Sequence, residues 1–186
     1  NTAVGYYTLL ANTTGAGNTA YGTSALNSNT TASNSTAVGC RALCSNTTGE
    51  RNQAFGNVAL ETNTTGNCNV AIGDRALQSN TTASNNTAIG VLALNANTTG
   101  TLNTALGANA LRDTTTGDRN IGLGYNAIRN ATTACCNIAI GVSAMQNSTT
   151  GNNNTAVGNA ALQANTTGTA NTAVGANALD ANISGI

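Results

Sequence analysis

The most frequent pattern with chemical meaning in this chain is asparagine followed two residues later by serine or threonine. This pattern is the acceptor for N-linked glycans, which are attached to the asparagine amide in secreted proteins. Ten acceptors of this kind fall in one recurring loop, at Asn12, Asn29, Asn46, Asn63, Asn80, Asn97, Asn130, Asn147, Asn165 and Asn182. They predict regularly spaced covalent glycans. The alternative is that Asn-Thr-Thr is turn and hydrogen-bonding chemistry in a chain rich in both residues.

The five cysteines are the next candidates for chemistry. They are Cys40, Cys44, Cys68, Cys135 and Cys136, and all of them occupy variable positions of the sequence pattern. A C-x-x-x-C spacing without histidine is a poor zinc site. Cys44 could approach Cys68, and the odd count leaves at least one thiol free or paired between chains. Ordinary small side chains and local or interchain disulfides both remain open.

The charged residues predict no catalytic site. Lysine and arginine together number six, aspartate and glutamate also number six, and the chain has no histidine. All six basic residues are arginines, so the commonest general base and the commonest amine nucleophile are both missing. The acids are scattered and form no recurring pair. We therefore expect a protein that is not an enzyme and that needs no cofactor or metal.

The charge and hydropathy patterns also bear on partners. No basic stripe exists that could neutralise phosphates, so nucleic acid is not expected as a partner. No run of about 18 apolar residues exists, so this segment is not expected to insert into a membrane.

All these residues belong to one 17-residue unit that is repeated eleven times without insertion or deletion. Its consensus is N-T-A-V-G-x-x-A-L-x-x-N-T-T-G-x-x, and positions 1–17 below are counted within this unit. A period of this length predicts a stacked repeat array. We expect a single uninterrupted array over residues 1–186, cut from a longer fibre protein. The units start at residues 1, 18, 35, 52, 69, 86, 103, 120, 137, 154 and 171.

Position 5 is glycine in every unit, which makes it the strongest column. An invariant glycine predicts positive φ or an approach too close for a Cβ atom. Position 3 is alanine in ten units, which also indicates close approach. The glycines of position 5 are Gly5, Gly22, Gly39, Gly56, Gly73, Gly90, Gly107, Gly124, Gly141, Gly158 and Gly175.

The remaining columns predict a mainly β repeat solenoid. Positions 2–4 are typical of a short strand, with positions 2 and 4 on one face and position 3 on the other. The large apolar residues at position 4 and the Ala-Leu pair at positions 8 and 9 are the predicted core. Positions 6–11 favour a turn, a one-turn helix or a second strand. The N-T-T-G residues of positions 12–15 predict a turn or strand whose side chains form ladders between units.

Two geometries fit such a repeat. A single-chain solenoid advances by the strand spacing of about 4.8 Å per unit, so eleven units would span roughly 50 Å. A trimeric spiral of extended segments would advance two or three times further per unit.

The N-T-A-V-G motif, with variants N-V-A-I-G at Asn69 and N-I-A-I-G at Asn137, resembles the S-V-A-I-G strands of trimeric autotransporter adhesin heads. The full pattern also looks like repeats in tail fibres of phages and in environmental adhesins. The resemblance implies a β-roll in an extracellular fibre, associated as a homotrimer or fibril. The adhesin roll has a period near 14, so the longer unit departs from that geometry.

These patterns together predict a non-catalytic structural segment of an extracellular fibre, such as a surface adhesin or a phage-type tail fibre. The expected location is extracellular, at a cell surface or on a virion. The expected partners are further copies of the chain and a cell-surface or glycan receptor. The alternatives are an ice-binding solenoid or a carbohydrate-binding solenoid that uses its threonine and asparagine ladders.

Overall fold

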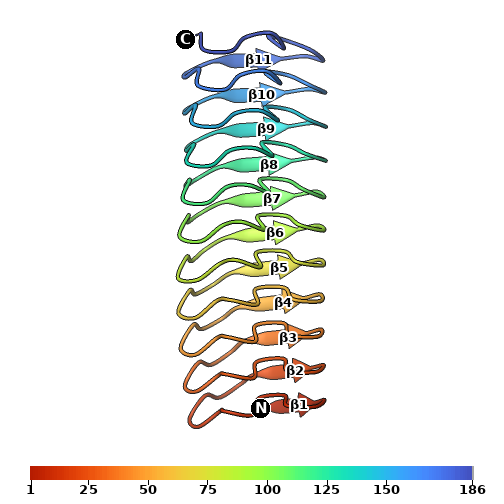
Figure 1. Ribbon diagram of the computed structural model, residues 1–186, viewed down its shortest axis with the longest axis vertical. Helices are drawn as coiled ribbons and strands as arrows, with labels where there is room; N and C mark the ends of the chain where they lie inside the picture. Colours follow the sequence, from red (N-terminus) through yellow and green to blue (C-terminus); the bar gives the residue numbers. More distant parts are fainter. Residues whose placement is uncertain (186) are drawn as a thin grey trace.

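The computed structural model describes residues 1–185 and shows a rod built from one coil per repeat (Figure 1). Each coil contributes one three-residue strand to a single sheet, and the strands lie in sequence order along the rod. The strands are β1 (Thr2–Val4), β2 (Thr19–Tyr21), β3 (Thr36–Val38), β4 (Gln53–Phe55), β5 (Val70–Ile72), β6 (Thr87–Ile89), β7 (Thr104–Leu106), β8 (Ile121–Leu123), β9 (Ile138–Ile140), β10 (Thr155–Val157) and β11 (Thr172–Val174).

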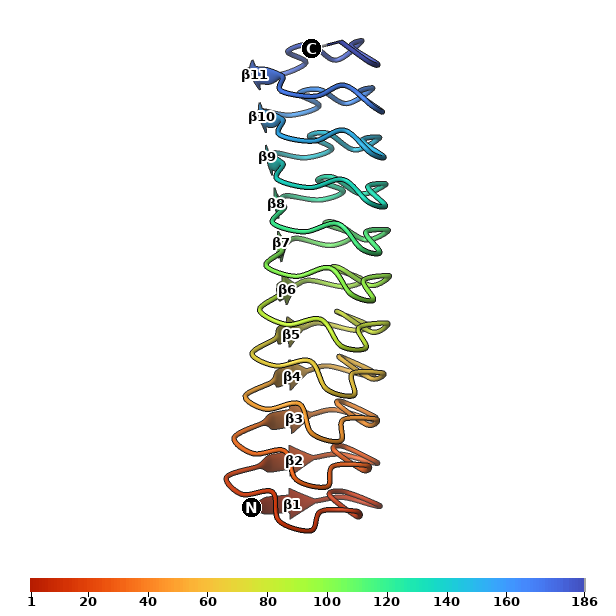
Figure 2. The same cartoon turned by 90° about the vertical axis from the view of Figure 1, so that its left-hand side faces the viewer.

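Every pair of neighbouring strands is parallel and is offset by one repeat. Ala71 of β5, for example, lies opposite Ala88 of β6, and equivalent positions face one another along the whole sheet. The coil-to-coil advance is therefore the strand spacing of about 4.8 Å. The predicted mainly β solenoid is confirmed, and the extended trimeric spiral is not this chain's structure. The strands turn progressively about the rod axis from β1 to β11, as parallel strands normally twist (Figure 2).

The core is a narrow column of small and medium side chains. In the inner coils, position 9 places one large side chain per coil at full burial, as in Leu60, Leu77 and Leu94. Alanines of positions 3 and 8 fill the remaining width, as in Ala71 and Ala76. The predicted burial of positions 8 and 9 is confirmed.

The prediction that position 4 belongs to the core is wrong. Ile72 and Leu106 are 39% and 48% exposed, whereas the neighbouring Ala71 and Ala105 are 0% exposed. Alternation along a strand places position 3 opposite to positions 2 and 4, so only one of these sets can face inward. The interior is wide enough only for alanine or glycine at the strand, and the larger residues of position 4 therefore lie outside.

The segment from position 6 to position 11 is a zigzag turn, and no helix occurs within residues 1–185. Its residues at positions 7 and 9 have positive φ, for example Arg75 at 57° and Leu77 at 51°. Alternate left-handed residues prevent a helical turn, so of the predicted alternatives the turn is confirmed and the one-turn helix is wrong. The backbone is bonded between coils instead, since Leu77 N donates to Ala93 O at 3.0 Å.

Candidate functional site

The asparagines of position 12 form a buried ladder along the rod. The side-chain nitrogen of Asn63 donates to Asn46 Oδ1 at 2.7 Å and to the backbone oxygen of Gly66 at 3.0 Å. The Oδ1 of Asn63 accepts a bond from Asn80 Nδ2 at 2.8 Å. Each inner amide therefore links its own turn to the coils on both sides. The predicted ladder of side chains between coils is present at this position.

A second buried ladder runs along position 1 and was not predicted from the sequence. Asn52 Nδ2 donates to Gly66 O at 2.7 Å, and Asn52 Oδ1 accepts the backbone N–H of Asn69 at 2.9 Å. Gly66 O therefore receives one bond from each ladder. The repeated Asn at the start of each unit was the available signal, but the consensus alone does not show that this side chain points inward.

The prediction of glycan acceptors is wrong in the folded chain for six of the ten asparagines, all of them at position 12. These six side chains are 0% exposed, and their amide nitrogens are already hydrogen-bonded, so no glycan fits there. They are Asn29, Asn46, Asn63, Asn80, Asn97 and Asn165.

Four acceptors remain predictions. Asn12, Asn130, Asn147 and Asn182 are half-buried and lie in the end coils or at position 11. Asn130 Nδ2 donates to Asn147 Oδ1 at 3.0 Å, so these two also interact between coils.

The position-12 ladder is interrupted in three consecutive coils, at Thr114, Ala131 and Ser148. Asn97 Oδ1, Thr114 Oγ1 and Ser148 Oγ are buried and have no hydrogen-bond partner in the part of the chain that the structure describes. A buried unpaired polar group costs about 1–3 kcal/mol. The interruption is therefore a local weak point of the rod.

Thr114→Asn is expected to raise the free energy of unfolding by about 1–2 kcal/mol, because two buried hydrogen bonds are restored. The new amide would donate to Asn97 Oδ1 and to Gly117 O, as the other coils do. Urea unfolding followed by circular dichroism measures the change, and Thr116→Asn on the exposed surface of the same coil is the control. A stabilisation no larger than that of the control would contradict the proposed pairing.

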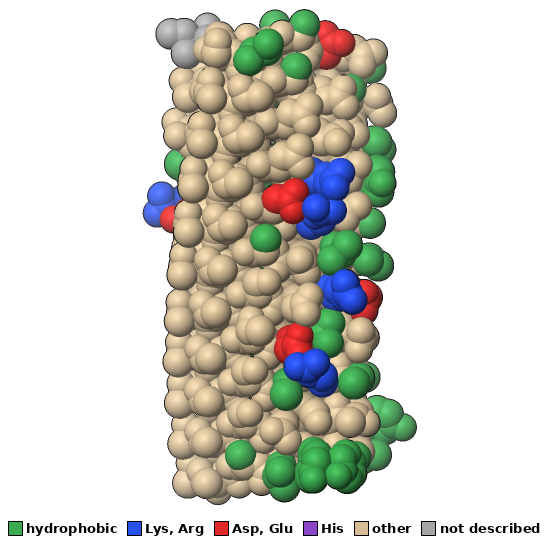
Figure 3. Space-filling view, viewed as in Figure 1, with side chains coloured by type: hydrophobic (Ala, Val, Ile, Leu, Met, Phe, Trp, Pro, Cys, Tyr) green, Lys and Arg blue, Asp and Glu red, His purple; other side chains and the backbone are tan. Residues whose placement is uncertain are grey.

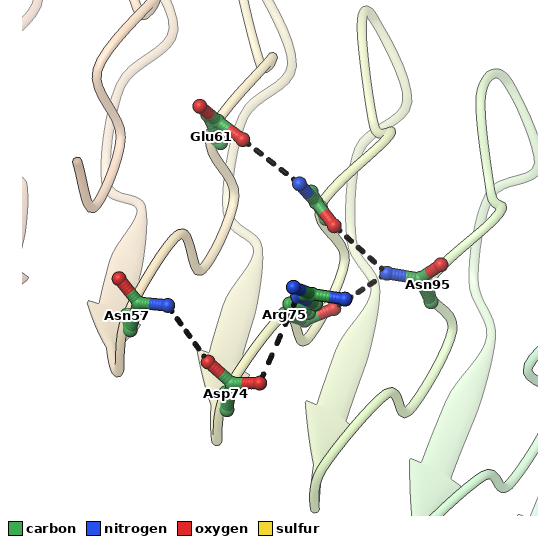
Figure 4. Close-up of polar contacts among 6 residues, drawn as sticks. Asn57, Glu61, Asp74, Arg75 and Asn95 are labelled. Atoms are coloured by element: carbon green, nitrogen blue, oxygen red, sulfur yellow. Dashed lines mark hydrogen bonds and ion pairs between the residues drawn. The ribbon is translucent and has the colours of Figure 1, made fainter. Parts of the chain in front are cut away.

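Charged side chains form small mixed clusters. On the face drawn in Figure 3, most of the surface is backbone and uncharged polar side chains, with basic and acidic residues side by side. Asp74 contacts Arg75 at 3.8 Å and accepts a bond from Asn57 at 2.9 Å (Figure 4). The half-exposed pair adds little stability, since surface ion pairs contribute about 0–1 kcal/mol.

One acid is largely buried. Glu61 is 6% exposed, pairs with Arg41 of the preceding coil and accepts a bond from Gln78 Nε2 of the next coil at 2.9 Å. Gln78 in turn accepts from Asn95 at 3.2 Å, so the polar chain in Figure 4 crosses three coils. These contacts link neighbouring coils through their side chains.

All five cysteines are free thiols. Cys40 and Cys68 are exposed, whereas Cys44, Cys135 and Cys136 are half-buried. Burial raises the pKa of Cys44, against the opposing charge of Arg41, and burial followed by a hydrogen bond with Cys136 raises the pKa of Cys135. A raised pKa keeps a thiol protonated at neutral pH, which makes it a weak nucleophile.

Maleimide labelling at pH 7 is expected to modify Cys40 and Cys68 several-fold faster than Cys44. Exposure favours the first two, and the raised pKa of Cys44 lowers its thiolate fraction. Peptide mass spectrometry over a time course measures the rates at each site, and the rate at Cys44 should rise as the pH is raised. Equal rates at Cys40 and Cys44 would contradict the structure.

The described residues contain no pocket and no group of three or more potential metal ligands. Over residues 1–185, no helix is long and apolar enough to cross a membrane. The repeat presents three other features that run along the rod: the buried amide ladders, an outer row of threonines at position 14, and the exposed apolar residues of position 4 on the sheet. The two exposed rows are the candidate surfaces for function.

The chain was also compared with known proteins. No protein-family model matches it, and no curated protein or solved structure was found to match.

Proposed function

We propose that this chain is a non-catalytic structural segment of an extracellular fibre, of the kind found in surface adhesins or phage-type tail fibres. The observation that carries the proposal is the unbroken in-register sheet of eleven parallel strands, in which each strand pairs only with its neighbours in sequence. Such an array adds length with every repeat and needs no other part of the chain to close a core.

The hydrogen bonds support a stiff spacer. Side-chain bonds of the two asparagine ladders and of the position-13 threonines run between coils, as in Thr64 Oγ1 to Thr81 O at 3.1 Å. They add to the backbone bonds, which also run mainly between coils. Bending the rod would stretch several of these bonds at every coil. A receptor-binding part and covalent glycans at the remaining acceptors would belong to the fibre as a whole.

The rod itself is tested by small-angle X-ray scattering on arrays shortened or lengthened by whole repeats. The maximum dimension should grow linearly, by about 4.8 Å for each added coil. Growth with the cube root of length would overturn the rod.

The extracellular role is tested by immunogold labelling of intact source cells or virions with antibodies against this segment. Label along surface filaments is expected, and label confined to the cell interior would overturn the role.

A second candidate function is ice binding. The threonines of position 14 are exposed in ten coils, one per coil, and form a regular row of hydroxyl and methyl groups along the rod. Regular spacing is what recognition of a crystal surface requires. Thermal hysteresis of the purified chain tests this function, with Thr65→Glu, Thr99→Glu and Thr133→Glu combined as the disrupting variant. Absence of hysteresis and of ice shaping in the unmodified chain would exclude it.

A further inference from the structure

The outer face of the sheet carries a continuous apolar stripe, which we call the strand-face stripe. It contains one large apolar side chain from position 4 of every coil. Large apolar residues are usually buried, but most of these are more than a third exposed, such as Ile72 at 39% and Leu106 at 48%. The stripe consists of Val4, Tyr21, Val38, Phe55, Ile72, Ile89, Leu106, Leu123, Ile140, Val157 and Val174.

Two properties make this face unlike an ordinary protein surface. First, positions 2 and 4 hold no charged residue in any coil, so the sheet presents only apolar residues, threonine and one glutamine. Second, the sheet is entirely parallel, and parallel sheets are normally covered on both faces. The inner face is covered by Leu and Ala of the same chain. Nothing within residues 1–185 covers the outer face, because each coil returns on the opposite side of its strand (Figure 2).

We propose that a second copy of this chain covers the strand-face stripe, so that two rods pack sheet against sheet. Another copy has the same repeat distance, so its side chains can interdigitate with the stripe at every coil. Positions 2 and 4 contribute 22 residues in eleven coils. This is the size of a stable interface, which uses about 20–30 residues on each side. Because the face carries no charge, a partner surface needs no charged residues to pair with it, and the same face of a second copy has none.

One edge of the face fits the same arrangement. Position 17, two residues before the next strand, holds an exposed asparagine or arginine in five of its ten coils, such as Arg51, Asn85 and Arg119. An apolar centre with a polar rim is the usual anatomy of an interface. A sheet face pairs with one opposing face at about 10 Å, which gives a dimer. The twist of the strands along the rod would make the two copies wind slowly about each other.

The pairing deepens the proposed fibre role and rests on it, since it makes the strand-face stripe the lateral contact of the fibre. It is tested by light scattering and sedimentation at micromolar concentration in reducing buffer. The unmodified chain is expected at twice its mass of 18.3 kDa. The triple variant Ile72→Glu, Leu106→Glu and Ile140→Glu places charges on alternate coils of the stripe and is expected to be monomeric.

The control carries the same three charges at the same spacing on an exposed row outside the strands, as Thr65→Glu, Thr99→Glu and Thr133→Glu, and should remain dimeric. All six altered side chains point outward, and circular dichroism checks that both variants keep the native β signal. A monomeric unmodified chain, a trimer, or equal association of the two variants would overturn the sheet-to-sheet pair. If the chain is monomeric but scattering still shows a rod that lengthens with each repeat, the pairing fails while the structural role stands.

Discussion

Replacing Asn63 by aspartate is expected to destabilise the fold by about 3–5 kcal/mol at pH 7, the range for leaving a buried charge without a partner. The change keeps the shape of the side chain, removes its hydrogen-bond donor and adds a negative charge. Asn63 is 0% exposed, and its nitrogen lies 2.7 Å from Asn46 Oδ1 and 3.0 Å from Gly66 O. A carboxylate oxygen in that place would face two acceptors without water.

Urea unfolding followed by circular dichroism measures this loss, and Asn159→Asp is the control because Asn159 is exposed at position 6. The control should change the free energy of unfolding by less than about 0.5 kcal/mol. The loss at position 63 should also shrink as the pH is lowered, because burial favours the protonated carboxyl, which can donate one hydrogen bond. Equal losses for the two variants would show that the amide ladder does not hold the coils together.

The repeat architecture could be predicted from the sequence because its signal is redundant. Eleven copies of one unit fix the coil length, and the Gly column and the Ala-Leu pair of positions 8 and 9 locate the turn and half of the core. The same redundancy explains why the single parallel sheet follows from the pattern. In-register repetition leaves each strand only its sequence neighbours as partners.

The face of the strand was predicted wrongly for a physical reason. Hydrophobicity favours burial of Ile72 over Ala71, and in a fold with a wider interior it would decide which face of the strand points inward. Here the interior holds one leucine and two alanines per coil, so width decides instead. The sequence did indicate that position 3 faces the narrow interior, because only Ala or Gly occurs there and a larger side chain would not fit.

The asparagine columns show a second limit of the sequence. Asn-Thr-Thr matches a glycan acceptor. It also suits a buried asparagine whose amide forms hydrogen bonds with the coils on both sides, and the sequence is the same in both cases. Burial distinguishes the two, and burial depends on the closed coil. The loss of Asn at Thr114, Ala131 and Ser148 breaks the ladder without breaking the fold, which shows that the backbone bonds set the coil and the amides reinforce it.

Gly73→Ala is expected to destabilise the chain by roughly 3–5 kcal/mol, through two costs that a matched variant can separate. The first is conformational, since Gly73 has φ of +135°, and a residue with a side chain pays about 1–3 kcal/mol in such a strained region. The second is steric, because a Cβ atom at Gly73 would lie 2.5 Å from the backbone oxygen of Gly90 in the next coil. That oxygen belongs to the stacked backbone and can move only if the coils separate.

Gly175→Ala isolates the first cost. Gly175 has a similar φ of +127°, but no further coil stacks on it within residues 1–185, and a Cβ atom there would meet only Ala178 Cβ at 3.9 Å. Thermal and urea unfolding of both variants should therefore give a loss of only about 1–3 kcal/mol at position 175, the strain of the backbone conformation alone. The larger loss at position 73 measures how tightly the coils are stacked at this column. Equal losses would mean that the coils can part locally without cost, and the stiff rod that the proposed fibre requires would then lack its physical basis.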